Sequence, residues 1–167
     1  MAGALIVTAE IAQGDFSWLE GLRRAHYPPD RNQVPAHLTI FHAIPPSAEP
    51  ELRSRLARTV RARPPEAMVA GVMDLGGGVA FRVFSPDLDR IRDELADALH
   101  GLLGVQDSGG WRPHITIQNK VAPKVARALM ESLERSFGPR PLAIRGLALH
   151  RYAGGPWEPV ADYPFRL

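Results

Sequence analysis

The chain carries the same four-residue pattern twice, and this repeat constrains its fold more than any other feature. HLTI spans residues 37–40, and HITI spans residues 114–117, which is 77 positions further along (114 − 37). Each copy follows a proline-containing loop and precedes a segment with apolar residues at every fourth position. The first half reads as strand, short helix, loop, motif strand, helix and strand, and the second half repeats this order. We therefore predict two related lobes, the HLTI repeat over about 1–77 and the HITI repeat over about 78–167, folded as a single domain about a pseudo-two-fold axis.

The secondary structure follows from hydrophobic periodicity. Helical spacing of apolar residues predicts helices over 15–25, 49–63, 85–104 and 122–139. Ser85 and Pro86 suit the start of the third helix, and Gly104 suits its end. The remaining apolar runs predict strands over 4–11, 37–44, 67–74, 78–84, 114–119, 142–152 and the tail 159–167.

Composition excludes several classes of protein. The sequence contains no cysteine, which rules out disulfides, thiolate zinc sites and cysteine nucleophiles. No apolar run approaches the ~20 residues that span a bilayer, and the first strand lacks the basic lead of a secretion signal. We expect a cytoplasmic monomer that does not contact membranes.

The 20 basic residues are almost all arginine, which either reflects genome composition or indicates an anionic partner. The arginines of 53–63 are read as the solvated face of a helix.

The spacing within each motif places its two polar side chains together. Alternate residues of a strand share a face, so His37 projects with Thr39, roughly 6–7 Å apart. His114 projects with Thr116 in the same way. If a two-fold axis relates the lobes, two imidazoles and two hydroxyls meet across one groove. One imidazole can remove a proton from a nucleophile while the other protonates the leaving oxygen, and the hydroxyls bond the non-bridging oxygens. This set of groups suits the opening of a phosphodiester.

The histidines allow two other interpretations. A single strand histidine is more often a packed or surface residue than a catalyst, but its recurrence at equivalent places of a repeat favours catalysis. A metal site needs a third ligand, and neither motif strand contains a carboxylate. We therefore expect no metal and no cofactor.

With both motifs and the repeat in view, the chain resembles the two-histidine (2H) phosphoesterases, whose defining pattern is a pair of His-x-Thr/Ser-x motifs. The resemblance implies an α+β, bilobal duplicated fold, in which each lobe has an antiparallel sheet and outer helices, with intertwined strand order and an active-site groove between the lobes. It implies that His37 and His114 are catalytic, and that Thr39 and Thr116 bind phosphate. By analogy His114 is the base and His37 the acid, although the pseudo-symmetry leaves the reverse open. The group includes RNA 2′,3′-cyclic phosphodiesterases, so the implied reaction is metal-independent hydrolysis of a cyclic phosphate at an RNA terminus or in a small cyclic nucleotide.

The loops before the motifs supply the candidate substrate-binding residues. Both loops should border the groove, where Tyr27 and Trp111 can stack on a base and Arg31 and Arg112 can face phosphates. Lys120 follows the second motif and shares the face of His114 if the strand continues that far without a bulge, so it can face phosphates as well. Strand parity places His42 on the face opposite His37, where we read it as structural.

Two alternatives for the function stay open, namely an RNA- or nucleotide-binding module with little catalysis, and an RNA 2′-5′ end ligase.

Overall fold

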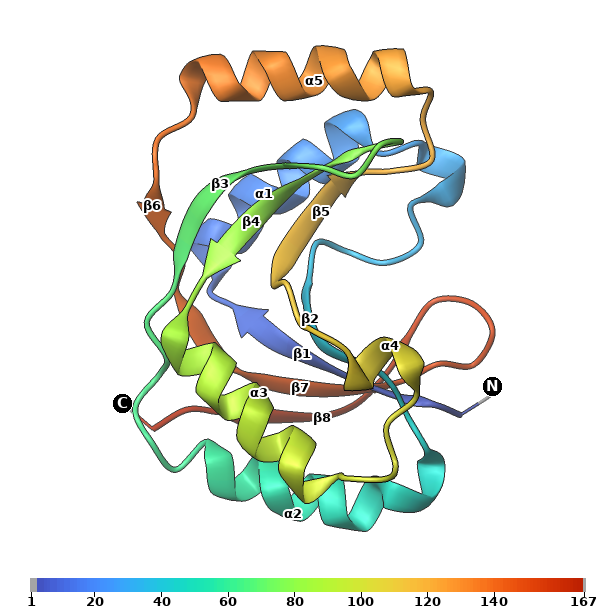
Figure 1. Cartoon of the computed structure of the whole chain (residues 1–167), viewed down its shortest axis with the longest axis vertical. Helices are drawn as coiled ribbons and strands as arrows, with labels where there is room; N and C mark the ends of the chain where they lie inside the picture. Colours follow the sequence, from blue (N-terminus) through green and yellow to red (C-terminus); the bar gives the residue numbers. More distant parts are fainter. Residues whose placement is uncertain (1–2, 167) are drawn as a thin grey trace.

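The computed structural model describes residues 3–166 of the chain. Figure 1 shows two sheets with helices on their outer sides. In chain order the elements are β1 (Leu5–Ile11), α1 (Gln13–His26), β2 (Leu38–Ile44), α2 (Glu49–Thr59), β3 (Met68–Asp74), β4 (Val79–Phe84), α3 (Pro86–Ala98), α4 (Val105–Ser108), β5 (His114–Gln118), α5 (Pro123–Ser136), β6 (Arg140–Pro141), β7 (Ile144–Arg151) and β8 (Glu158–Pro164). Short 3-10 turns cover Pro29–Arg31 and Pro46–Ala48.

The strands form two four-stranded sheets, ordered β2-β1-β7-β8 and β5-β4-β3-β6. Every strand pair is antiparallel, which confirms the predicted α+β fold with two sheets. The two halves of the sequence exchange strands. β3 of the first half pairs in the second sheet, and β7 and β8 of the second half complete the first sheet. This exchange makes each motif strand, β2 or β5, an edge strand of its sheet.

The helices cross between the sheets as well. α1 follows β1 of the first sheet but contacts β5 of the second, while α5 contacts β3 and β4. α2 and α3 lie together on the outer side of the first sheet (Figure 1). Each sheet is therefore covered by one helix from each half of the chain. A helix that packs on the partner sheet fixes the two motif strands relative to each other.

The apolar stripes recognised in the sequence form the buried face of these helices. On α3, Leu88 is fully buried and Leu95 nearly so, and burying such a side chain contributes about 1.5–3 kcal/mol. The Ser85 hydroxyl accepts a hydrogen bond from the Leu88 amide at 3.1 Å, which confirms the predicted start of this helix. The helix ends at Ala98 rather than at residue 104. Gly101 has a φ of 84°, a left-handed conformation that an α-helix does not continue through.

Two other helices are also shorter than predicted, and α4 was not predicted. α2 ends at Thr59 and α5 at Ser136. α4 is a single turn, too short for any periodicity to reveal. The predicted tail strand corresponds to β8, and its last residue, Leu167, lies outside the described residues.

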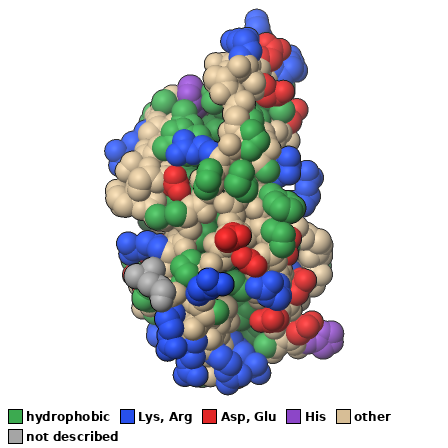
Figure 2. Space-filling model, turned by 90° about the vertical axis from the view of Figure 1, so that its left-hand side faces the viewer, with side chains coloured by type: hydrophobic (Ala, Val, Ile, Leu, Met, Phe, Trp, Pro, Cys, Tyr) green, Lys and Arg blue, Asp and Glu red, His purple; other side chains and the backbone are tan. Residues whose placement is uncertain are grey.

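Charged side chains of both signs cover the surface around α2. Arg53 pairs with Glu49 and Arg55 with Glu51, each at 2.9 Å and one helical turn apart. Figure 2 shows Lys and Arg side chains gathered at its lower end, with acidic side chains among and above them. This supports the interpretation of the arginines of α2 as a solvated helix face. Within residues 3–166, no helix has the length and apolar composition needed to cross a lipid bilayer.

Candidate active site

The two motifs meet in one cavity. β2 and β5, the edge strands of the two sheets, contact each other. A cavity of about 410 Å³ lies beside them and is lined by His37, Thr39, His114 and Thr116. The other lining residues are His42, Arg92, Gln106, Gly110, Trp111, Arg112 and Trp157. The structure therefore brings together the four side chains that the repeat singled out.

Both motif histidines are anchored in the same way. His37 Nδ1 lies 2.7 Å from the carbonyl oxygen of Pro35, and His114 Nδ1 lies 2.8 Å from that of Arg112. A carbonyl oxygen can only accept, so each Nδ1 carries a hydrogen and donates it. The acceptor is the residue two positions earlier in both motifs. Each neutral ring therefore leaves Nε2 without a proton and able to accept one.

The surroundings of the two rings differ. His37 packs edge-on against Trp157, with ring centroids 4.7 Å apart. Burial lowers the pKa of His37 from 6.5 to about 4, and although the Pro35 carbonyl raises it, nearby positive charge at Arg23 adds to the lowering. At neutral pH His37 is therefore an uncharged imidazole and a proton acceptor.

Two buried arginines support the motif strands, and the sequence analysis missed both. Arg23 of α1 donates from Nη1 to the carbonyl of Thr116 at 2.9 Å. Arg92 of α3 donates from Nε to the carbonyl of Ile40 at 3.3 Å. Each arginine belongs to the helix that crosses from the other half of the fold. A signal was present, because Arg92 lies four residues after Leu88 and so falls on the buried stripe of its helix.

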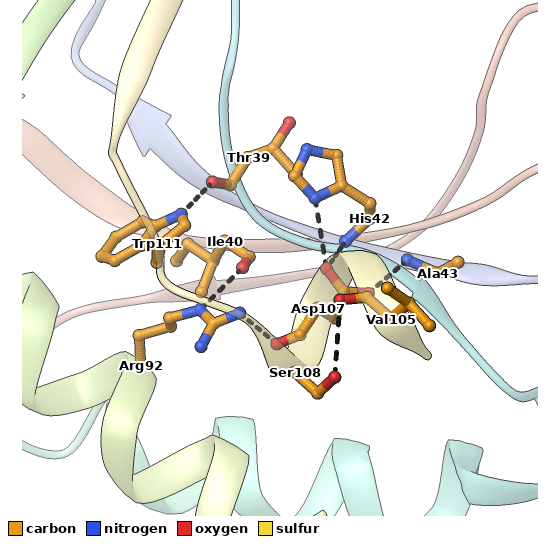
Figure 3. A network of polar contacts seen from close by, with 9 residues as sticks. All are labelled: Thr39, Ile40, His42, Ala43, Arg92, Val105, Asp107, Ser108 and Trp111. Carbon is orange, nitrogen blue, oxygen red and sulfur yellow. Dashed lines mark hydrogen bonds and ion pairs between the residues drawn. The ribbon is translucent and has the colours of Figure 1, made fainter. Parts of the chain in front are cut away.

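The first motif strand has additional hydrogen bonds (Figure 3). The Trp111 indole donates to the carbonyl of Thr39 at 3.1 Å. The Arg92 guanidinium donates to the carbonyl of Asp107 and lies 5.8 Å from the Trp111 ring centroid. Trp111 thus serves as a backbone support for the motif as well as a wall of the cavity.

The face predicted for His42 is wrong. Thr8 of β1 pairs with Thr39, but Val7 pairs with Phe41, so β2 advances two residues where β1 advances one. This is a β-bulge, and it breaks the alternation on which the parity argument depended. Phe41 turns into the core and His42 lines the cavity with His37.

The predicted substrate-binding residues divide into two groups. Trp111 and Arg112 line the cavity, whereas Tyr27, Arg31 and Lys120 do not. The Arg23 guanidinium lies over the Tyr27 ring, 4.2 Å from its centroid. Arg31 is exposed beside Asp30 at 3.8 Å. Lys120 lies beyond the end of β5 with a φ of 65°, so strand parity does not extend to it. The structure therefore places these three residues outside the lining of this cavity.

Among residues 3–166, no three His, Asp or Glu side chains are grouped so that they could hold a metal ion. The polar groups of the cavity lining are imidazoles, hydroxyls, two indoles, a carboxamide and guanidinium groups. Such a set is suited to binding an anion and transferring protons.

Comparison with known proteins agrees with this arrangement. The model of the 2′-5′ RNA ligase superfamily matches residues 11–156 of the chain. The chain belongs to this superfamily, which is a branch of the two-histidine phosphoesterases. No curated protein sequence gives a match.

Solved structures share the fold. TT0787 of Thermus thermophilus is 16% identical, with a TM-score of 0.68 and 98% of each chain covered. A structure described as a phosphoesterase is 16% identical, with a TM-score of 0.64 and 100% of each chain covered. LigT of E. coli complexed with 3′-AMP is 14% identical, with a TM-score of 0.60 and 100% of each chain covered. At these identities the likeness establishes the architecture.

Proposed function

We propose that this protein is a metal-independent phosphodiesterase that hydrolyses 2′,3′-cyclic phosphates at RNA ends or in small cyclic nucleotides. The observation that carries the proposal is the convergence of both motifs on one cavity, with each imidazole anchored through Nδ1. Membership of the superfamily supports a phosphoesterase. LigT, which shares the fold, has been crystallised with 3′-AMP and with phosphate, which supports a nucleotide phosphate as the ligand class.

The electrostatics support His37 as the general base. A base must be uncharged before the reaction, and burial keeps the pKa of His37 well below neutral pH. Its Nε2 takes a proton from water as the water oxygen bonds to phosphorus. This assignment reverses the analogy drawn from the sequence, which gave the base role to His114.

His114 is then the general acid. With Nδ1 held by the Arg112 carbonyl, a protonated ring donates from Nε2 to the ribose oxygen as its bond to phosphorus breaks. The products are a phosphomonoester and a ribose hydroxyl, and the two histidines have exchanged protonation states. The Thr39 and Thr116 hydroxyls donate to the non-bridging oxygens, where negative charge increases in the transition state.

A hydrolysis assay with the four nucleoside 2′,3′-cyclic monophosphates and an RNA oligomer bearing a cyclic phosphate end tests the proposal. We expect the wild-type protein to turn over at least one class with a chelator present. His37→Ala and His114→Ala should each lower kcat about 10²–10⁴-fold. His100→Ala is the matched control, because His100 is exposed and lies outside the cavity.

The alternatives predict different outcomes of the same assay. Tight nucleotide binding without turnover of any substrate would replace the proposal with a binding module. Joining of a cyclic phosphate end to a 5′-hydroxyl end, faster than hydrolysis, would replace it with a ligase.

A further inference from the structure

A third imidazole, that of His42, belongs to the cavity but has no role in the reaction described above. The bulge at Ile40 and Phe41 places the His42 side chain on the cavity side of β2. Figure 3 shows the hydrogen bonds that hold its ring against Asp107. A strand advances about 3.3 Å per residue, so the two Cα atoms are within ~10 Å. Thr39 and His42 line the same cavity, so a phosphate held by the Thr39 hydroxyl lies in the space that the His42 ring borders.

The His42 ring is held in one orientation by a buried carboxylate. Asp107 Oδ1 lies 3.1 Å from His42 Nδ1 and accepts from the His42 amide at 2.8 Å. Its second oxygen accepts from the Ala43 amide at 2.8 Å. A carboxylate oxygen accepts, so Nδ1 donates to it and Nε2 is left for a ligand. This repeats the arrangement of the two motif histidines, with a carboxylate in place of a carbonyl.

The Asp107 carboxylate is itself fixed and ionised. Its side chain is only 2% exposed. Burial alone would raise the pKa of Asp107, but hydrogen bonds from the His42 ring and from the His42 and Ala43 amides outweigh it and hold the pKa below its usual value. The Arg92 guanidinium bonds the Asp107 carbonyl and so ties α4 to the core.

The second motif strand has no counterpart to this pair. The position equivalent to His42 is Asn119, five residues after its motif histidine. Asn119 follows the end of β5, and its side chain accepts from the Lys120 amide at 3.0 Å. The extra imidazole therefore makes the cavity asymmetric and adds a donor on the Thr39 side alone.

We propose that His42, oriented by Asp107, is a third ligand-contacting residue, which donates a hydrogen bond from Nε2 to an anionic oxygen of the phosphate bound at Thr39. In the complex the ring has taken a proton from solvent and bridges the phosphate and Asp107 with both N–H groups. The inference rests on the proposed function for the identity of the anion. It assigns His42 to phosphate binding and Asp107 to the positioning of His42.

Two substitutions at His42 separate contact with the ligand from a structural role. The side-chain nitrogen of asparagine can replace Nδ1, and that of glutamine can replace Nε2. His42→Asn therefore keeps a donor towards Asp107 and loses the donor towards the ligand, while His42→Gln does the reverse. We expect His42→Asn to weaken binding of inorganic phosphate and of 3′-AMP by about tenfold or more, measured by calorimetry at pH 7. The affinity of His42→Gln for both ligands should stay within about threefold of that of the wild type. The affinity of the control variant His100→Asn should equal that of the wild type.

The order of the two variants decides the outcome. Affinity that is lower in His42→Gln than in His42→Asn, or equal to wild type in both, would overturn the ligand contact. Asp107→Asn tests the positioning role through the ¹⁵N signals of the His42 ring, which should lose their preference for a protonated Nδ1. An unchanged tautomer in that variant overturns the role of Asp107. The binding assay needs no turnover, so an inactive wild-type protein refutes the proposed function without deciding this inference.

Discussion

The two motif strands, β2 and β5, are built alike but are not electrostatically equivalent. In both, a carbonyl two residues before the histidine holds Nδ1, and a buried arginine from a crossing helix bonds the strand backbone. Around the first motif, however, Trp157 packs on the imidazole, and His42 and Asp107 add a further pair. The duplicated scaffold sets the positions of the groups, and we propose that the unshared neighbours decide which imidazole gives a proton and which accepts one.

The largest expected effect of the difference between His37 and His114 is on the turnover of an activated substrate. A p-nitrophenyl phosphodiester has a leaving group that departs without protonation, so it needs the base but not the acid. We expect His114→Ala to recover to within about tenfold of the wild-type kcat on this substrate, while His37→Ala stays about 10²-fold or more below it. The measurement is the kcat of each variant on the activated and the cyclic substrate. Recovery of His37→Ala instead would restore the assignment drawn by analogy, with His114 as the base.

Substitution of the two buried arginines tests whether both motif strands depend equally on the helix that crosses to them. Arg92→Met keeps the length of the side chain but loses the hydrogen bonds to the carbonyls of Ile40 and Asp107. Arg23→Met loses those to the Thr116 carbonyl and the Asn32 side chain. Each variant should lose about 2–3 kcal/mol of unfolding free energy, because buried acceptors are left without donors.

Urea unfolding of both variants measures this loss. The exposed Arg58→Met is the control and should change the free energy of unfolding by less than about 0.5 kcal/mol. A loss confined to one of the two variants would show that only one motif strand depends on its crossing helix.

Much of this architecture was accessible from the sequence, because two strong local signals agree. The repeated motif identified the four central residues, and the leucine periodicity gave the long helices to within a few residues at most ends. The position of Trp111 at the cavity wall followed from its place in the loop before the second motif. These are features in which neighbours in the chain determine the outcome.

The rest depends on contacts between distant segments. No single strand shows that β2 is bulged, because the extra residue is defined only by the pairing of β1 with β2. Trp157 reaches His37 from a loop 120 residues later (157 − 37). The pairing of His42 with Asp107 requires α4, a turn too short to predict. Sequence reasoning therefore found the four side chains that meet in the cavity but not the neighbours that distinguish the two motifs.

The pH dependence of the reaction sharpens the comparison further. If His37 is the base, the acidic limb of kcat/KM follows its pKa of about 4, so most of the activity persists at pH 5. A base with the ordinary pKa of 6.5 would retain about 3% at that pH, a difference of roughly 30-fold.

Trp157→Ala opens the His37 ring to water, and the acidic limb should then move upwards towards 6.5. The profile of kcat/KM between pH 4 and 8 measures both effects. An acidic limb near 6.5 in the wild type that Trp157→Ala leaves in place would contradict the role of burial at His37.

The last effect concerns stability. In the unfolded chain His37 takes up a proton near pH 6.5, but in the folded protein only near pH 4. Within this window the unfolded state binds the extra proton, so the free energy of unfolding falls as the pH falls, by at most about 1.4 kcal/mol per pH unit. His37→Gln has no such proton, so thermal unfolding between pH 7 and 4 should show a shallower loss than in the wild type. His100→Gln, altered at an exposed site, should keep the wild-type slope. Equal slopes for the wild type and His37→Gln would mean that the folded protein protonates His37 as readily as the unfolded chain does, which would remove the electrostatic difference between the two motifs.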